Sequence, residues 1–100
     1  MNELIWSKPA QIEYWKNIDF LLKHWTEKEA IEFITKTEGI LEIIIENPRT
    51  FRKFNYRKNI HTVPITKEIN LFYQVKKDKI ELLRFWNNYQ DPKKLDLKET

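Results

Sequence analysis

Residues 69–86, INLFYQVKKDKIELLRFW, decide the fold of this chain. Apolar and polar side chains alternate over residues 69–76 and again over residues 79–86, which predicts two strands. Only a short charged turn joins these strands, so they should pair antiparallel. A similar run at residues 59–65 precedes them and completes a three-stranded antiparallel meander. Because Pro64 cannot donate a hydrogen bond to a neighbouring strand, we expect the first of the three at a sheet edge.

Upstream of the meander the spacing of apolar residues lengthens from about two to about 3.6 residues, which indicates helices. Ser7 can cap the first helix, and Pro9 is tolerated in its first turn, so this helix should span residues 9–24. Its apolar residues recur at intervals of three and four and are expected to face the core: Ile12, Trp15, Ile18, Leu22 and Trp25.

The second helix should begin at a capping box formed by Thr26 and Glu29 and end at Asn47-Pro48. Only a residue or two join the helices, so they should form an antiparallel hairpin. The stripe expected in the core is Ala30, Phe33, Ile34, Thr37, Ile40, Leu41 and Ile44. The acidic residues expected on the solvated face are Glu32, Glu38, Glu42 and Glu46.

With an opening strand at residues 3–6, the predicted order is β-α-α-β-β-β. This is an α+β fold, in which a helix hairpin packs on one face of a small, mainly antiparallel sheet. We expect one domain over residues 1–95, with a short helical turn near Asp91-Pro92, and a charged tail over residues 96–100.

The composition excludes several kinds of site. The chain has 100 residues, no cysteine and one glycine, which rules out disulfides, thiolate zinc sites, cysteine nucleophiles and Gly-rich phosphate loops. His24 and His61 lack the spacing of metal ligands, so we expect no metal and no cofactor. No apolar run approaches the ~20 residues of a membrane span, and the first residues do not resemble a signal peptide. We therefore expect a cytoplasmic protein that does not enter membranes.

Charge is unevenly distributed along the chain. Residues 27–46 carry six acidic residues and two lysines, whereas residues 49–67 carry six cations and no acidic residue. Cations and aromatic residues interleave over residues 49–58, a pattern that suits single-stranded nucleic acid. The candidate nucleic-acid-binding residues are Arg49, Arg52, Lys53, Arg57 and Lys58. The alternative is that Phe51 and Phe54 pin a loop onto the core, with the cations merely solvated.

The order and these residues resemble the RelE/ParE superfamily of type II toxin–antitoxin toxins. The resemblance covers about Leu4 to Leu95. The segments that carry it are Ile5-Trp6, Asn47-Pro48-Arg49, the strand Asn70-Leu71-Phe72-Tyr73-Gln74-Val75, the strand at residues 80–86, and Asn87-Asn88-Tyr89-Gln90-Asp91-Pro92. It implies a small growth-inhibiting toxin held silent by a cognate antitoxin. RelE-like members cut mRNA on the ribosome, and ParE-like members poison DNA gyrase.

RelE-like cleavage is a metal-free attack of a 2′-hydroxyl on its neighbouring phosphate, which needs a proton acceptor, cations and a donor to the leaving oxygen. The basic positions that the resemblance implies fall on His61, Val63, Asn70 and Gln90, and Asn87 stands where many relatives have histidine. The cations missing at Asn70 and Gln90 weaken mRNA cleavage as the activity, so whether the chain is an enzyme stays open.

Three residues remain candidates for catalysis, each with a structural alternative. His61 could transfer a proton, or be a strand histidine with a local hydrogen bond. Arg84 could face the phosphate, or pair with a carboxylate of a helix. Tyr89 could donate to a leaving group or stack on a base, or cap the end of the sheet. A further alternative is an interaction or nucleic-acid-binding domain that keeps the fold without toxicity or catalysis.

Overall fold

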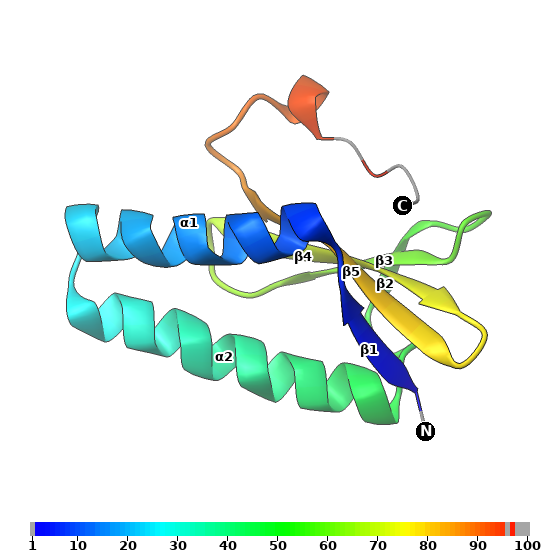
Figure 1. Cartoon of the computed structure of the whole chain (residues 1–100). Coiled ribbons are helices and arrows are strands. Elements are labelled where there is room, and N and C mark those ends of the chain that lie inside the picture. Colours follow the sequence, from blue (N-terminus) through cyan, green and yellow to red (C-terminus); the bar gives the residue numbers. More distant parts are fainter. Residues whose placement is uncertain (1, 96, 98–100) are drawn as a thin grey trace.

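The structure, a computed structural model, describes residues 2–95 and 97. One five-stranded sheet, in the order β1-β5-β4-β3-β2, carries two helices on one face (Figure 1). In chain order the elements are β1 (Glu3–Trp6), α1 (Lys8–His24), α2 (Glu27–Glu46), β2 (Arg52–Asn55), β3 (Ile60–Pro64), β4 (Ile69–Lys76), β5 (Lys79–Asn87) and the 3-10 turn η1 (Pro92–Lys94). The predicted α+β class, helix hairpin and mainly antiparallel sheet are confirmed. The predicted tail, residues 96–100, lies outside the described residues apart from Leu97.

The sheet contains one strand more than predicted. β2 lies in the segment interpreted from sequence as a basic loop, and it pairs antiparallel with β3, so four strands follow the helices instead of three. The prediction that β3 forms an edge is therefore wrong. Pro64 is nevertheless tolerated, because β2 ends its pairing at Arg52 with Thr62, and Pro64 pairs only with Asn70 of β4.

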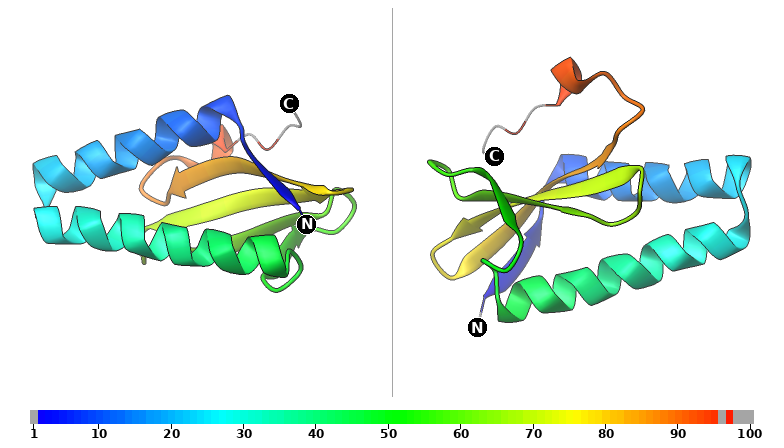
Figure 2. Two further views of the ribbon diagram at one scale, coloured as in Figure 1. Left: turned by 60° about the horizontal axis from the view of Figure 1, so that its bottom comes forward. Right: turned by 180° about the vertical axis from the view of Figure 1, so that it is seen from behind.

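Both predicted helix starts are confirmed by their capping contacts. The Ser7 hydroxyl accepts a hydrogen bond from the Ala10 N–H at 3.1 Å. At the start of α2, Thr26 and Glu29 form the reciprocal capping box. The hydrogen bonds from Thr26 hold the pKa of the Glu29 carboxyl below its usual value. Figure 2 shows the two helices side by side on the same face of the sheet.

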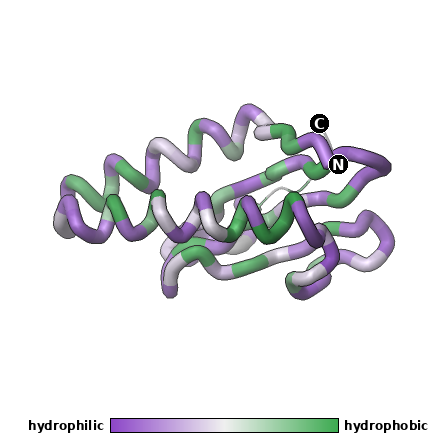
Figure 3. Tube along the Cα trace, turned by 90° about the horizontal axis from the view of Figure 1, so that it is seen from below, coloured by the Kyte–Doolittle hydropathy of each residue, from purple (hydrophilic) through white to green (hydrophobic). Residues whose placement is uncertain are grey.

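The buried face of α1 differs from the predicted one. Ala10, Asn17 and Ile18 are buried, whereas Trp15 is 62 % exposed. The residues wrongly predicted to face the core, and exposed instead, are Ile12, Trp15, Leu22 and Trp25. Apolar and polar residues alternate along both helices in Figure 3, so hydropathy alone did not fix which side of α1 faces inward. On α2, by contrast, the predicted stripe and the solvated acidic face are confirmed.

The inward face of α1 is set by the edge of β5. β1 pairs in parallel with Lys79–Leu82 and then ends, which leaves the rest of the β5 edge without a strand beside it. Side chains from the start of α1 supply the missing partners: Ser7 Oγ donates to the Leu83 carbonyl at 3.0 Å, and Asn17 Nδ2 donates to the Phe85 carbonyl at 3.2 Å. The Glu13 carboxylate accepts from the Phe85 N–H at 3.1 Å. These polar residues take over the hydrogen bonds of a strand.

Apolar side chains cover both faces of the sheet. The larger core lies between sheet and helices and includes Phe33, Tyr73 and Phe85. A smaller cluster on the other face, which we call the outer face, consists of Ile60, Phe72, Leu83 and Trp86. Leu95 and Leu97 pack against this cluster, so the segment after β5 crosses the outer face.

Candidate functional site

We call β2, β3 and the turn between them the basic hairpin (residues 52–64). Its turn and the α1–α2 connection lie at opposite ends of the molecule (Figures 1 and 2). Asn59 adopts a positive φ of 54°, which asparagine tolerates. The Asn55 side chain accepts from the Lys58 N–H at 3.1 Å, and Gln74 Nε2 donates to the Lys58 carbonyl at 2.9 Å. These contacts fix the shape of the turn.

The cations of this region are mostly free. Arg49, Arg52, Arg57 and Lys58 are exposed, and none forms an ion pair with a described residue. Lys53 is half-buried: its ammonium donates to Asn59 Oδ1 at 3.3 Å and lies 5.3 Å from the centre of the Tyr56 ring. With no acidic residue between residues 49 and 67, the hairpin presents an uncompensated positive charge.

The aromatic residues of the region divide into anchors and exposed rings. Phe51 packs on the helix-side core, as its alternative interpretation predicts. Phe54 is exposed, although its ring meets that of Phe72 edge-on at 5.0 Å, and Tyr56 is 76 % exposed. Exposed aromatic rings beside free cations are the combination on which bases stack and phosphates bind.

A hollow of about 400 Å³ lies where the hairpin meets the outer face. Arg52, Thr62, Pro64 and Asn70 are among its lining residues, and Arg52 is the only charged one. The Asn70 amide donates to Asn88 Oδ1 at 3.4 Å. The hollow thus offers a guanidinium and an amide, because the Thr62 hydroxyl oxygen is buried, and none of its lining side chains can transfer a proton near neutral pH.

His61 lies on the helix side of the sheet and is 1 % exposed. Its Nδ1 lies 2.8 Å from the Phe51 carbonyl oxygen, which can only accept, so Nδ1 carries the proton. Its ring stacks on that of Tyr73 at 5.2 Å, and Nε2 has no hydrogen-bond partner among the described residues. This geometry matches the alternative of a strand histidine with a local hydrogen bond. Burial raises the pKa of Tyr73 to about 12.

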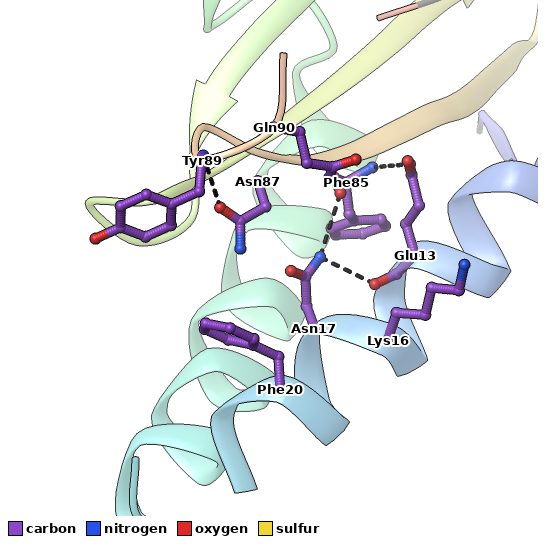
Figure 4. Close-up of a pocket in the computed structure, with 8 residues that line it drawn as sticks. All are labelled: Glu13, Lys16, Asn17, Phe20, Phe85, Asn87, Tyr89 and Gln90. Carbon is purple, nitrogen blue, oxygen red and sulfur yellow. Dashed lines mark hydrogen bonds between the residues drawn. The ribbon is translucent and has the colours of Figure 1, made fainter. Parts of the chain in front are cut away.

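Arg84 pairs with a carboxylate of α1, as one of its two interpretations predicts. Its Nε donates to Glu13 Oε1 at 2.9 Å and its Nη2 to Oε2 at 2.6 Å, while the guanidinium lies 5.1 Å from the centre of the Trp86 ring. Tyr89 is exposed beside a pocket between α1 and the end of β5 (Figure 4). His61 therefore lies in the core, Arg84 at the edge of β5 and Tyr89 at the mouth of a pocket. The three candidates do not share one site.

Sequence reasoning missed the pocket beside Tyr89. It has a volume of about 580 Å³, and Asn17 and Phe20 of α1 and Asn87 of β5 line it (Figure 4). The available signal was Asn17, a polar residue of low helix propensity between the apolar residues Tyr14 and Ile18.

Within residues 2–95 and 97, no group of three or more His, Asp or Glu side chains could hold a metal ion. Neither helix in the described part of the chain is long and apolar enough to cross a membrane.

No protein-family model and no curated protein matches the sequence. Solved structures do match over most of their length. The chromosomal ParDE toxin–antitoxin system of P. aeruginosa aligns at 13 % identity and a TM-score of 0.72, covering 87 % of this chain and 96 % of that one. The YoeB/ParE toxin of Agrobacterium tumefaciens aligns at 13 % identity and a TM-score of 0.61, covering 85 % of this chain and 96 % of that one. The YoeB-YefM toxin–antitoxin complex of Staphylococcus aureus aligns at 15 % identity and a TM-score of 0.55, covering 85 % of this chain and 94 % of that one.

Proposed function

We propose that this chain, whose fold is that of the RelE/ParE toxins, is the toxin of a type II toxin–antitoxin pair. Residues 1–95 form the toxin domain, and a cognate antitoxin is its partner. The similar structures support this proposal, because they include toxin–antitoxin complexes. The site of action is the cytoplasm, where the candidate targets, DNA gyrase and the translating ribosome, are found.

The basic hairpin is the proposed working surface. Arg52, Arg57 and Lys58 are exposed without an ion pair to a described residue, and Tyr56 stands beside them. This arrangement can bind a target that contains nucleic acid. When the cations neutralise phosphates, counterions are released from the nucleic acid, and this release favours binding. The single observation that carries the proposal is this free positive charge at one end of the molecule.

We favour inhibition by binding, with DNA gyrase on its DNA as the target. Metal-free RNA cleavage needs a group to accept a proton beside the phosphate. His61 is buried on the helix side, and the hollow at Arg52 has no such group, so the residues that would support cleavage are not gathered on the exposed face. Ribosome-dependent mRNA cleavage is the second candidate, and the exposed Phe54 and Tyr56 rings favour it, because they suit single-stranded RNA.

The test is the double variant Arg57→Ala/Lys58→Ala, expressed from an inducible promoter without the neighbouring antitoxin gene. We expect the wild-type chain to arrest growth and the double variant to lose most of this effect. The matched control is Lys23→Ala/Lys28→Ala, which removes two exposed cations at the opposite end of the molecule and should keep full toxicity. Equal toxicity of the two double variants would remove the basic hairpin as the working surface.

Assays with the purified protein then distinguish the two candidate targets. A gyrase supercoiling assay should show inhibition by the wild-type chain, whereas transcript ends mapped on programmed ribosomes should stay unchanged. If the hairpin contacts duplex phosphates, Arg57→Ala/Lys58→Ala should reduce the slope of log affinity against log salt by about 1.8. New transcript ends with normal supercoiling would instead select mRNA cleavage. A chain that never arrests growth would be an interaction domain that keeps the fold without toxicity.

A further inference from the structure

The pocket between α1 and the end of β5 is lined by the side-chain amides of two asparagines that are otherwise buried (Figure 4). Asn17 and Asn87 are 6 % and 9 % exposed, so each residue is more than nine-tenths buried. They come from different walls of the pocket, one from the helix and one from the last residue of the strand. One polar atom of each amide is reached by solvent through the pocket, so it is available to a bound group.

Existing hydrogen bonds fix the orientation of both amides. Asn17 Nδ2 donates to the Glu13 carbonyl at 2.9 Å and to the Phe85 carbonyl at 3.2 Å, which uses both of its N–H groups and leaves Oδ1 as a free acceptor. Asn87 Oδ1 accepts from the Tyr89 N–H at 2.9 Å, which leaves the two N–H groups of Asn87 Nδ2 without a partner among the described residues. In Figure 4 the free oxygen and the free nitrogen both point toward the space above Phe20.

The walls around this donor and acceptor are aromatic. The rings of Phe20 and Tyr89 stand on two sides of the space, and the exposed Tyr89 ring is free to lie against a bound group (Figure 4). A flat group can therefore stack on a ring while its edge meets Asn17 and Asn87. Stacking of this kind tolerates any base, because each base has a π-face.

The charges at the rim favour a phosphate on one side. Glu13 is already paired with Arg84 at 2.6 Å, whereas the exposed Lys16 has no ion pair with a described residue. The adjoining pocket, which shares Phe20, Asn87 and Tyr89, carries the carboxylates of Glu29, Glu32 and Glu68 against the one ammonium of Lys36, so it is acidic on balance. A phosphate should therefore lie toward Lys16 and away from this acidic side.

The geometry points to a nucleobase site, in which a base presents a hydrogen-bond donor to Asn17 Oδ1 and an acceptor to Asn87 Nδ2, stacks on Tyr89, and directs its phosphate to Lys16. All four bases carry a donor beside an acceptor on their pairing edge, so these two contacts fit any of them. The base belongs to a free nucleotide or to an RNA strand, and the titration below distinguishes these two sources. This site lies apart from the basic hairpin and does not depend on the proposed function.

The test is a titration of the full chain followed by ¹H–¹⁵N correlation spectra, with the side-chain amides of Asn17 and Asn87 as reporters. The probes are the four ribonucleoside 5′-monophosphates, a short single-stranded oligoribonucleotide, ribose 5-phosphate and N-acetylglutamine amide. We expect saturable shifts of both reporters with at least one monophosphate or with the oligoribonucleotide, and none with the other two probes. Binding of monophosphates indicates a free nucleotide as the source, and binding of the oligoribonucleotide alone indicates a strand.

Two variants test the contacts. Tyr89→Ala should weaken binding by about tenfold, the loss expected of one stacked ring. Asn87→Asp keeps the acceptor for the Tyr89 N–H but replaces the donor to the ligand, so binding should also fall by about tenfold or more. The control Trp15→Ala truncates an exposed aromatic residue of α1 that does not line the pocket, and it should leave the titration unchanged.

Four outcomes would overturn the inference. Equal shifts with ribose 5-phosphate would mean that the phosphate binds without the base. Equal shifts with N-acetylglutamine amide would mean that the pocket takes a peptide amide. No saturable shift with any nucleotide would remove the base site, and so would equal affinity in Tyr89→Ala and Trp15→Ala. None of these results depends on growth arrest, so they leave the proposed toxin activity to its own experiments.

Discussion

The helix side of the sheet and the basic hairpin use the same residue types in opposite ways. Tyr73 is fully buried and its hydroxyl donates to the Pro48 carbonyl at 2.8 Å, whereas Tyr56 stands in solvent. Arg84 is held by Glu13, whereas Arg52 forms no ion pair with a described residue. The difference teaches that burial and partners, more than residue type, separate side chains that hold the fold from those that are available to a target.

The comparison predicts its largest effect for a phenylalanine on each side. Phe85 is fully buried, and its ring packs against Trp6 and Tyr14 at 5.4 Å and 5.3 Å. Phe85→Ala should therefore lower the free energy of unfolding by about 3–5 kcal/mol in urea denaturation. Phe54→Ala, on the half-exposed ring of the hairpin, should cost less than about 1.5 kcal/mol. Similar losses for both variants would contradict the division between the two regions.

A second effect concerns pH. Burial raises the pKa of Tyr73 from 10.0 to about 12, so the folded state favours the neutral phenol. The contribution of the neutral Tyr73 phenol to the free energy of unfolding is fully present below pH 10 and is lost as the pH rises from 10 toward 12. Its full size is about 2–3 kcal/mol, at about 1.4 kcal/mol per pKa unit. Urea midpoints measured at pH 8 and pH 11.5 should show most of this loss. In Tyr73→Phe the loss should be clearly smaller; an unchanged loss would mean that other groups cause the alkaline sensitivity.

A smaller effect is expected from the paired and unpaired arginines. Glu13→Gln keeps the acceptor for the Phe85 N–H but leaves the guanidinium of Arg84 without its counter-charge, which should cost about 2 kcal/mol. Arg52→Gln removes an exposed cation and should change stability by less than about 0.5 kcal/mol. Thermal or urea unfolding of both variants checks the difference. A Glu13→Gln variant as stable as the wild type would show that the Arg84 pair contributes little.

Local signals in the sequence were sufficient for much of the fold. The capping box at Thr26 and the stop at Asn47-Pro48 depend on neighbouring residues only, and both are present in the structure. The strands at residues 69–76 and 79–87 follow from alternation and a short turn, which are also local properties. Such features do not need knowledge of distant contacts.

Long-range contacts explain what the sequence could not predict. β2 has only four residues and a bulge, and its two cations and single aromatic residue hide its alternation. The inward face of α1 depends on Asn17 meeting the Phe85 carbonyl, 68 residues away in the chain, and Arg84 meets Glu13 across 71 residues. For the candidate site, the exposure of Arg52, Arg57 and Lys58 agrees with the basic pattern, but nothing local placed His61 in the core.

The way in which α1 completes β5 bears on how other chains can attach. Ser7, Glu13 and Asn17 occupy the hydrogen-bonding groups of the part of β5 that lies beyond β1. The rest of that border is the four-residue strand β1, and the opposite border is a short, kinked, cationic strand. Borders protected in this manner resist polymerisation through added strands. An incoming polypeptide is therefore expected to recognise side chains on the surface and not to lengthen the ladder of main-chain bonds.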